Sequence, residues 1–362
     1  MPVTKGNPVP WKSVLSLSFY EEPNVGYKVY RLHFNENLFL PRQYYEKLLS
    51  AALDPELIRY YTEPLNPTFN EALARYLNVD AGNVFTVAGG DEGLRLLIQF
   101  ALHGLRKILI VEPTYSMPRI LAESMGLTAN QVLLRDGTYE LNLEELIRLG
   151  GSHDIIYLCD PNNPTGNLFS REDIEYLVSH VDSLIVIDEA YAEFARFSVI
   201  DLTRDYENIA VIRTFSKAWG LAGLRVGYVV ASDTVIDGLK RLSLPHNIPY
   251  TSMVLVLRAL ELRDYVERGI DNMVSVRDIM TKSLDDLGLN PIPSVTNFIT
   301  FHVGSQEKAN GVHEELLRRG FVVRNLSGKV LCEDCLRVTV PPMNVAEMFI
   351  STLENIVKHR GL

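Results

Sequence analysis

One lysine lies in a sequence context that suits covalent chemistry with an aldehyde. Lys217 closes the segment TFSK at residues 214–217, so small hydroxyl side chains precede it, and Arg225 follows. An amine condenses reversibly with an aldehyde, while hydroxyls and a planar guanidinium can hold a phosphate. Asp188 ends an apolar run and can keep a pyridine nitrogen protonated. Together these residues suit a pyridine aldehyde cofactor that carries a phosphate.

The residues after Lys217 favour a buried amine. Residues 218–224 read AWGLAGL, whereas a solvated surface lysine would have polar neighbours. Burial and nearby cations lower the pKa of a lysine from about 10.4 and favour its neutral, nucleophilic form. We therefore expect Lys217 to be buried and reactive.

A pair of glycines predicts a phosphate cradle. Gly89 and Gly90 lie between an apolar run at residues 84–88 and a helical pattern. The free N–H groups of a helix N-terminus favour an anion, and glycine lets the backbone approach it closely. A plain glycine turn has the same pattern, so this motif indicates a phosphate site only in combination with the other motifs.

Two further motifs follow apolar runs, at the edge where open α/β sheets bind ligands. The DPNNPTG motif at residues 160–166 either forms a rigid proline turn or places the Asn163 amide at a cofactor oxygen. Tyr191 follows Asp188 closely enough to reach the same side of a ring, although an aspartate here can also cap the next segment. The Asp188 carboxyl and the Tyr191 hydroxyl would then bind opposite ends of one heterocycle.

The elements that must position these residues form an α/β pattern. We expect a mostly parallel sheet, covered by helices on both faces, and a smaller α+β domain. The expected domains are an N-terminal arm at 1–40, a large domain at 41–245 and a small domain at 246–362. In the large domain we expect strands at 84–88, 107–111, 154–158, 184–188, 209–213 and 226–230, and helices at 92–103, 119–125, 143–149 and 170–180. In the small domain we expect helices at 254–262, 266–287, 309–319 and from 345, and strands at 297–302, 321–324 and 336–340.

Composition narrows the class of protein. The chain has 362 residues, 47% hydrophobic and 22% charged, with a net charge of −10. A negative balance argues against nucleic-acid or anionic-membrane partners. We see no signal peptide and no run long enough to cross a membrane, and expect a soluble cytoplasmic protein.

Three cysteines are too few for a disulfide framework. Cys332 and Cys335 form a C-x-x-C motif, and Cys159 stands apart. Zinc would need two more ligands, and no second C-x-x-C or H-x-x-x-H motif exists. We therefore expect two thiols in a loop and no metal site.

In order and spacing, the motifs resemble the pyridoxal-phosphate (PLP) aminotransferases of fold type I, and among them the histidinol-phosphate aminotransferase branch. The resemblance covers residues 35–340 and implies the aspartate-aminotransferase-like fold, whose large-domain sheet is α/β, mostly parallel and seven-stranded. It implies Lys217 as the Schiff-base lysine, Asp188 as the partner of the pyridine nitrogen, and Asn163 with Tyr191 at the phenolic oxygen. Tyr115 resembles the residue stacked on the ring. The positions that match the phosphate-binding residues are Gly90, Asp91, Glu92, Thr214, Ser216 and Arg225.

The resemblance also implies a homodimer with shared active sites. Tyr60 resembles the tyrosine that reaches the neighbouring subunit's phosphate, with Tyr61 as the alternative because the usual proline is absent.

Four positions resemble substrate-binding residues. Arg337 resembles the arginine that binds the α-carboxylate, and Arg324 a second one suited to a phosphate, although strand-end arginines also pair with surface acids. Tyr20 and Asn35 resemble residues near the substrate. The chain departs from the family pattern after the NEN segment and after Val340, both at the substrate mouth.

The resemblance implies transamination of L-histidinol phosphate with 2-oxoglutarate, giving imidazole-acetol phosphate and L-glutamate in histidine biosynthesis. An aromatic amino-acid aminotransferase and a threonine-phosphate decarboxylase share the same cofactor residues and are the alternatives. A non-enzymatic PLP-binding module is the distant rival, since no basic helix-turn-helix segment accompanies these motifs.

Overall fold

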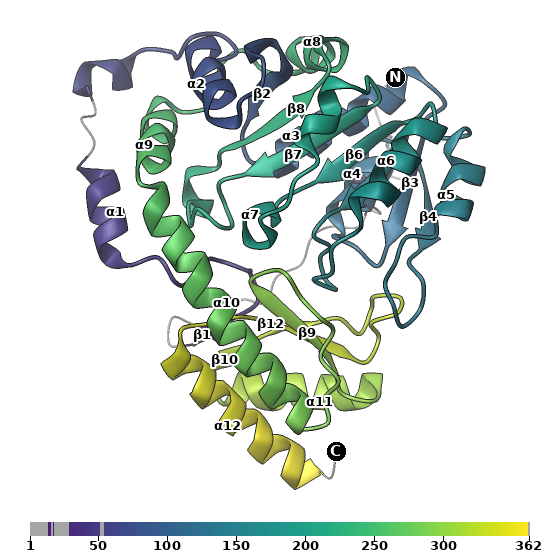
Figure 1. The fold of residues 1–362 in the computed structure, drawn as a ribbon, viewed down its shortest axis with the longest axis vertical. Helices are drawn as coiled ribbons and strands as arrows, with labels where there is room; N and C mark the ends of the chain where they lie inside the picture. The colour runs from purple at the N-terminus through teal and green to yellow at the C-terminus, as the bar shows by residue number, and fades with distance from the viewer. Residues whose placement is uncertain (1–13, 16, 18–28, 51–53, 361–362) are drawn as a thin grey trace, which may run out of the picture.

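The centre of the molecule is a seven-stranded sheet. The computed structural model describes residues 14–15, 17, 29–50 and 54–360 (Figure 1). The strand order is β2-β8-β7-β6-β5-β3-β4, and β8 runs antiparallel to both its neighbours while the other strands are parallel. The strands are β2 (Val84–Val87), β3 (Lys107–Glu112), β4 (Thr128–Leu133), β5 (Ile155–Cys159), β6 (Leu184–Asp188), β7 (Ile209–Thr214) and β8 (Gly227–Ala231). The predicted α/β class and mostly parallel sheet are confirmed.

Both faces of this sheet are buried. Along β5, Ile156 and Leu158 pack on one side, and Ile155 and Tyr157 pack on the other, as the two-residue period of a strand requires. The helices that pack on the second side are α3 (Gly90–Phe100), α4 (Met117–Ser124) and α8 (Asp233–Leu242). Those on the first side are α1 (Arg42–Leu49), α2 (Pro67–Leu77), α5 (Leu143–Gly150), α6 (Arg171–His180), α7 (Ala192–Ala195) and α9 (Tyr250–Glu261).

The six predicted strands of the large sheet are present within one residue at each end. The seventh, β4, was not predicted, because its sequence TANQVL is polar and only Val132 is buried. It forms the sheet edge beside β3, where one row of side chains faces solvent. The helices α1, α2 and α8 were also not predicted.

A smaller module follows α9 in the chain. Its three-stranded antiparallel sheet has the order β11-β12-β9, and a separate two-stranded sheet pairs β1 with β10. Long helices pack against these sheets (Figure 1). The elements are β1 (Tyr30–Arg31), β9 (Phe298–His302), β10 (Phe321–Val322), β11 (Arg324–Asn325), β12 (Cys335–Thr339), α10 (Arg263–Asp286), α11 (Gln306–Arg318) and α12 (Met343–Arg360). Over the described residues, no helix is both long and apolar enough to span a bilayer.

The predicted strand at 321–324 is wrong as a single element. Phe321 pairs in parallel with Tyr30, whereas Arg324 pairs in antiparallel register with Arg337. The chain therefore changes partners at Val323, and the apolar run alone could not reveal the change. This switch turns Arg324 toward Arg337 on the neighbouring strand.

The described part of the N-terminal region connects the two modules. Next to β1, the Thr339 N–H donates to the Leu32 carbonyl at 2.8 Å. Farther along, the Asn37 side chain donates to the Ala218 carbonyl at 2.6 Å, next to Lys217. The domain boundaries at residues 40 and 245 stay a prediction.

Candidate active site

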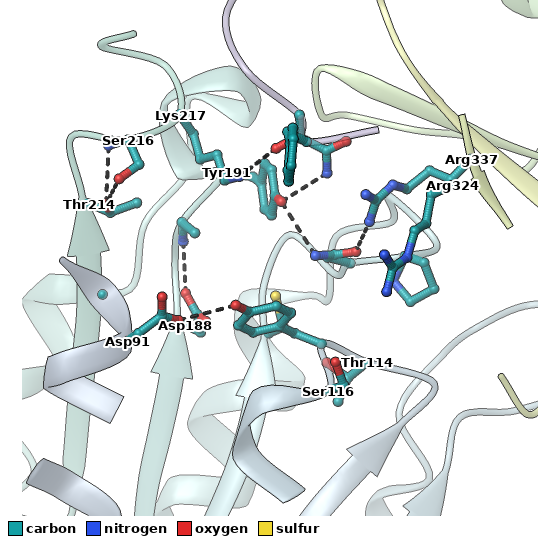
Figure 2. Close-up of a pocket in the computed structure, with 18 of the residues that line it drawn as sticks. Asp91, Thr114, Ser116, Asp188, Tyr191, Thr214, Ser216, Lys217, Arg324 and Arg337 are labelled. Carbon is teal, nitrogen blue, oxygen red and sulfur yellow. Dashed lines mark hydrogen bonds between the residues drawn. The ribbon is translucent and has the colours of Figure 1, made fainter. Parts of the chain in front are cut away.

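A cavity of about 360 Å³ lies at the carboxyl ends of β5, β6 and β7 and reaches the strands of the smaller module (Figure 2). Open α/β sheets bind ligands at this edge. Most of the predicted site residues line this cavity. They are Asn35, Gly90, Asp91, Tyr115, Asn163, Asp188, Tyr191, Thr214, Ser216, Lys217, Arg225, Arg324 and Arg337.

Lys217 is partly buried at this cavity and has a weakened affinity for protons. Its Nζ donates to the Phe34 carbonyl at 2.8 Å and lies 5.7 Å from the centre of the Tyr191 ring. Desolvation, and after it the positive charge of Arg337, lower the pKa of Lys217 to about 8, while the negative charge of Asp91 opposes both. Much of the amine is therefore neutral at mildly alkaline pH and able to attack an aldehyde.

Asp188 ends β6 at the floor of the cavity. Its Oδ2 accepts a hydrogen bond from the Tyr157 hydroxyl at 2.9 Å, and its Oδ1 accepts one from the Ala190 N–H at 3.1 Å. Burial raises the pKa of Asp188 to about 6, although the Tyr157 hydrogen bond lowers it. A cation in contact with this carboxylate would compensate for its lost solvation. Asp188 therefore favours the protonated, positively charged form of a pyridine nitrogen placed against it.

A hydrogen-bonded chain joins the two modules across the cavity (Figure 2). The Tyr191 hydroxyl accepts from the Asn35 amide at 3.0 Å and from the Asn163 amide at 3.4 Å. Arg337 donates to the Asn163 side-chain oxygen and, at 2.7 Å, to the His33 carbonyl. Burial raises the pKa of Tyr191, so its hydroxyl keeps a proton that it can donate to a ligand oxygen.

The N-terminus of α3 forms an anion-binding corner. Gly89 precedes it with φ +86° and no side chain caps its first N–H groups. A β-carbon on Gly89 would lie 2.6 Å from the Arg225 guanidinium, so only glycine lets the two approach. The Thr214 hydroxyl donates to Ser216 at 3.0 Å beside this corner. Uncapped N–H groups, two hydroxyls and a guanidinium match the needs of a phosphate group, so these residues fit PLP.

Tyr115 reaches the same corner from the loop after β3. Its hydroxyl donates to Asp91 at 3.2 Å, and Asp91 lies 3.5 Å from the Arg225 guanidinium. The ring therefore lies at the cavity wall, where it can contact a bound heterocycle.

Two predicted site residues, Glu92 and Tyr60, lie away from this cavity. The Glu92 carboxylate accepts from the Ala88 N–H and from the Asn247 amide at 3.2 Å, so it holds the backbone that leads into α3 and does not line the cavity. Tyr60 is 60% exposed and lines a separate groove. Tyr20 lies outside the described residues.

The sequence reasoning missed a further cation in the cavity. Lys329 donates to the Thr114 carbonyl at 2.6 Å and lies 3.8 Å from Glu112. It belongs to the loop between β11 and β12, and no local motif marks it. The cavity is also lined by residues that the sequence did not predict. They are His33, Phe34, Thr114, Ser116, Cys159, Pro164, Ala190 and Leu326.

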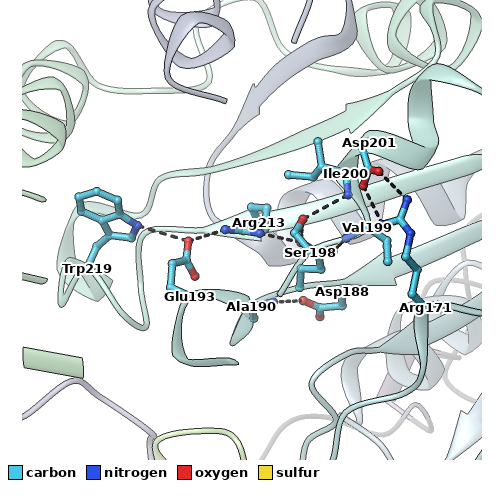
Figure 3. A network of polar contacts seen from close by, with 11 residues as sticks. Arg171, Asp188, Ala190, Glu193, Ser198, Val199, Ile200, Asp201, Arg213 and Trp219 are labelled. Carbon is cyan, nitrogen blue, oxygen red and sulfur yellow. Dashed lines mark hydrogen bonds and ion pairs between the residues drawn. The ribbon is translucent and has the colours of Figure 1, made fainter. Parts of the chain in front are cut away.

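A buried ion network holds the segments that carry Lys217 and Asp188 (Figure 3). Arg213 on β7 contacts Glu189 at 2.6 Å and Glu193 at 2.9 Å. The Trp219 indole donates to Glu193 at 3.4 Å. Separating a buried ion pair is costly because it leaves an uncompensated charge. These contacts therefore hold β7, the segment after Asp188 and the segment after Lys217 in fixed positions.

Comparison with known proteins agrees with this geometry. Residues 27–351 match the family model "Aminotransferase class I and II". A histidinol-phosphate aminotransferase of Thermoanaerobacter pseudethanolicus is 31% identical over 341 residues, which cover 93% of this chain and 95% of that protein. The histidinol-phosphate aminotransferase of Sinorhizobium meliloti, solved with pyridoxal-5'-phosphate, shares the fold with a TM-score of 0.87 at 23% identity, covering 99% of this chain and 100% of that one. An L-threonine-O-3-phosphate decarboxylase of Porphyromonas gingivalis shares it with a TM-score of 0.77 at 21% identity, covering 91% and 100%. The chain therefore belongs to the class I and II aminotransferases and is a PLP-dependent enzyme.

Proposed function

We propose that this enzyme transfers the amino group of L-histidinol phosphate to 2-oxoglutarate, giving imidazole-acetol phosphate and L-glutamate for histidine biosynthesis. Relatives that carry the name histidinol-phosphate aminotransferase match most of the chain, at 31% identity in one case. The observation that carries the proposal is a cluster of cations on the substrate side of the cavity.

The cluster consists of Arg324, Arg337 and Lys329. The first two are register partners on adjacent strands, and Figure 2 draws them across the cavity from Thr214. One active site must take the phosphate of histidinol phosphate in one half-reaction and two carboxylates of 2-oxoglutarate in the other. Neighbouring guanidiniums suit both anions, whereas an aromatic amino acid needs only one cation for its carboxylate.

Each residue of the cavity then has a role. Bound PLP supplies an electron sink for the electrons of the substrate α-carbon. Lys217 holds the cofactor through its Nζ and, once released, moves the proton of the α-carbon. Asp188 keeps the pyridine nitrogen protonated, and Tyr191 with Asn163 donates to the ring oxygen.

The remaining cofactor residues hold the phosphate and the ring. The N–H groups at Gly90 and Asp91, the hydroxyls of Thr214 and Ser216, and Arg225 bind the phosphate. Tyr115 covers the ring, and Asn35 orients the Tyr191 hydroxyl.

A spectroscopic half-reaction tests the substrate. Purified enzyme is mixed with L-histidinol phosphate, L-phenylalanine or L-threonine phosphate, and the loss of the aldehyde form of the cofactor is followed together with keto product and CO2. We expect the fastest conversion with histidinol phosphate and no CO2. Faster conversion of phenylalanine would favour the aromatic aminotransferase, and CO2 release would favour the decarboxylase.

We further propose a homodimer in which Tyr60 completes the partner's phosphate site. Tyr60 and Tyr61 are exposed, at 60% and 87%, beside an apolar groove that includes Met253 and Leu257. Sedimentation velocity should give a dimer, and Y60A should bind PLP more weakly than the control Y176A, whose tyrosine is exposed on α6. A fully active monomer would refute shared sites. The cytoplasmic location stays a prediction.

A further inference from the structure

A second cluster of reactive side chains lies outside the active-site cavity, where β9 meets β12. His302 and Cys335 are register partners on these strands, and Asp334 precedes Cys335. The His302 Nδ1 lies 2.9 Å from Asp334 Oδ1 and 3.4 Å from Cys335 Sγ. Cys335 Sγ lies 3.6 Å from the same Asp334 oxygen. Three different potential metal ligands therefore meet at one point.

Cys332 contacts Cys335 and is the candidate for a fourth ligand. Its sulfur does not belong to the group of three ligand atoms that lie within 4.8 Å of one another, so its side chain must turn toward them to bind the same ion. The Cys335 N–H donates to the Cys332 carbonyl at 3.0 Å, which closes a tight turn and brings the two side chains into contact. Both thiols are fully buried and neither forms a disulfide. The C-x-x-C spacing is one that zinc sites use, and two thiols of this spacing in a protein without a disulfide framework more often bind metal or do chemistry than form a bridge.

The distances agree with tetrahedral coordination. Zinc bonds of about 2.0–2.3 Å at the tetrahedral angle place neighbouring ligand atoms roughly 3.3–3.8 Å apart. The two distances from the Cys335 sulfur already have this length, and the histidine–aspartate pair needs a small expansion. The other Asp334 oxygen accepts from the Gly304 N–H at 3.2 Å, an outer contact that orients the carboxylate.

We propose that Cys332, Cys335, His302 and Asp334 form a structural zinc site. All four positions are then filled by protein, so the ion would have no open position for catalysis. The side chains of His302 and Asp334 are 31% and 28% exposed, which gives the ion a path from solvent. On binding, the two thiols release their protons and become thiolates.

The position of this site suggests what the ion would stabilise. The loop between β11 and β12 carries Leu326 and Lys329 into the active-site cavity and ends at Asp334. Its Leu331 carbonyl accepts from the Tyr139 hydroxyl at 3.2 Å. A zinc ion would fasten the end of the loop to β9 and so hold Lys329 in place.

Metal content of the holoenzyme tests the proposal directly. The protein is purified without a histidine tag, supplied with Zn²⁺ and reductant, passed through a weak chelator and analysed by mass spectrometry of the metal. We expect one Zn²⁺ per chain in the wild type and almost none in C335S or H302A. The matched controls H180A and C159S change a histidine on α6 and the third thiol, and should keep the ion.

Zinc that is absent from the wild type, or retained unchanged in H302A, would overturn the proposal. A Cys332–Cys335 disulfide in place of zinc under reducing conditions would overturn it as well. Because His302 is partly exposed, H302A decides the question even where C335S fails to fold, and the visible absorbance of bound PLP reports folding in each variant. Removal of zinc with a strong chelator should also lower the Tm of the wild type but not of H302A.

Discussion

The two sides of the active-site cavity are built differently. On the cofactor side, Asp188, Thr214 and Lys217 lie at or just beyond the ends of neighbouring buried strands. On the substrate side, contacts join residues that are far apart in sequence: Arg337 and Asn163 are separated by 174 positions, and Asn35 and Tyr191 by 156. The cofactor side is therefore positioned by one sheet, whereas the substrate side depends on how the smaller module and the N-terminal segment pack on that sheet.

The largest effect should come from the cofactor side. K217A removes the amine that holds the cofactor and moves the α-carbon proton, and general acid–base groups contribute about 10²–10⁴-fold. We expect at least that loss of kcat for every amino donor, measured by single-turnover spectroscopy. Borohydride reduction should label Lys217 in the wild type and in the control K240A. A variant K217A with near wild-type turnover would refute the role.

D188N should impair all donors equally by roughly 10²–10³-fold, as loss of a preorganised electrostatic contact does. The amide keeps the shape of the side chain but loses the charge that stabilises a protonated pyridine nitrogen. The measurement is kcat/KM for histidinol phosphate and for glutamate. A loss confined to one donor would mean that Asp188 acts on the substrate side after all.

On the substrate side, the effects should depend on the donor. R337A should lower kcat/KM by about 10–100-fold for every anionic substrate, because hydrogen bonds to charged groups contribute about 1.5–3 kcal/mol. R324A should lower it for histidinol phosphate and 2-oxoglutarate but much less for phenylalanine, which carries one carboxylate. PLP affinity, measured by titration of apoenzyme at a pH well above the Lys217 pKa of about 8, should stay unchanged in both. A weaker PLP affinity in R337A or R324A would show that these arginines also act on the cofactor side of the cavity.

The smallest effect should reveal coupling between the two sides. Arg337 is the second cause, after desolvation, of the lowered Lys217 pKa of about 8. PLP capture by apoenzyme needs the neutral amine, so its rate should rise with pH and level off above that pKa. R337Q removes a positive charge that disfavours protonation, so the midpoint should move to higher pH while remaining below the ordinary lysine value. An unchanged midpoint would mean that Arg337 does not act on Lys217.

Prediction from the sequence succeeded where local pattern and burial coincide. The strands β6 and β7 are largely apolar runs because both faces of the sheet are covered. Asp188 is the last residue of β6 and Lys217 lies just after β7, so the ends of these runs locate both reactive residues. It failed where tertiary contacts choose between equivalent local options. Glu92 in the first turn of α3 binds the Ala88 N–H that precedes the helix, and the run at 321–324 divides between two sheets.

The sequence by itself determined the α/β sheet and the reactive lysine, since continuous apolar runs and a motif beside a strand are local properties. Only the tertiary structure decided which distant groups meet. Lys329 enters the cavity from a loop without a motif, and His302 reaches Cys335 across a strand pair. The physical reason is that packing of the smaller module sets these distances, and packing depends on residues spread over the whole chain.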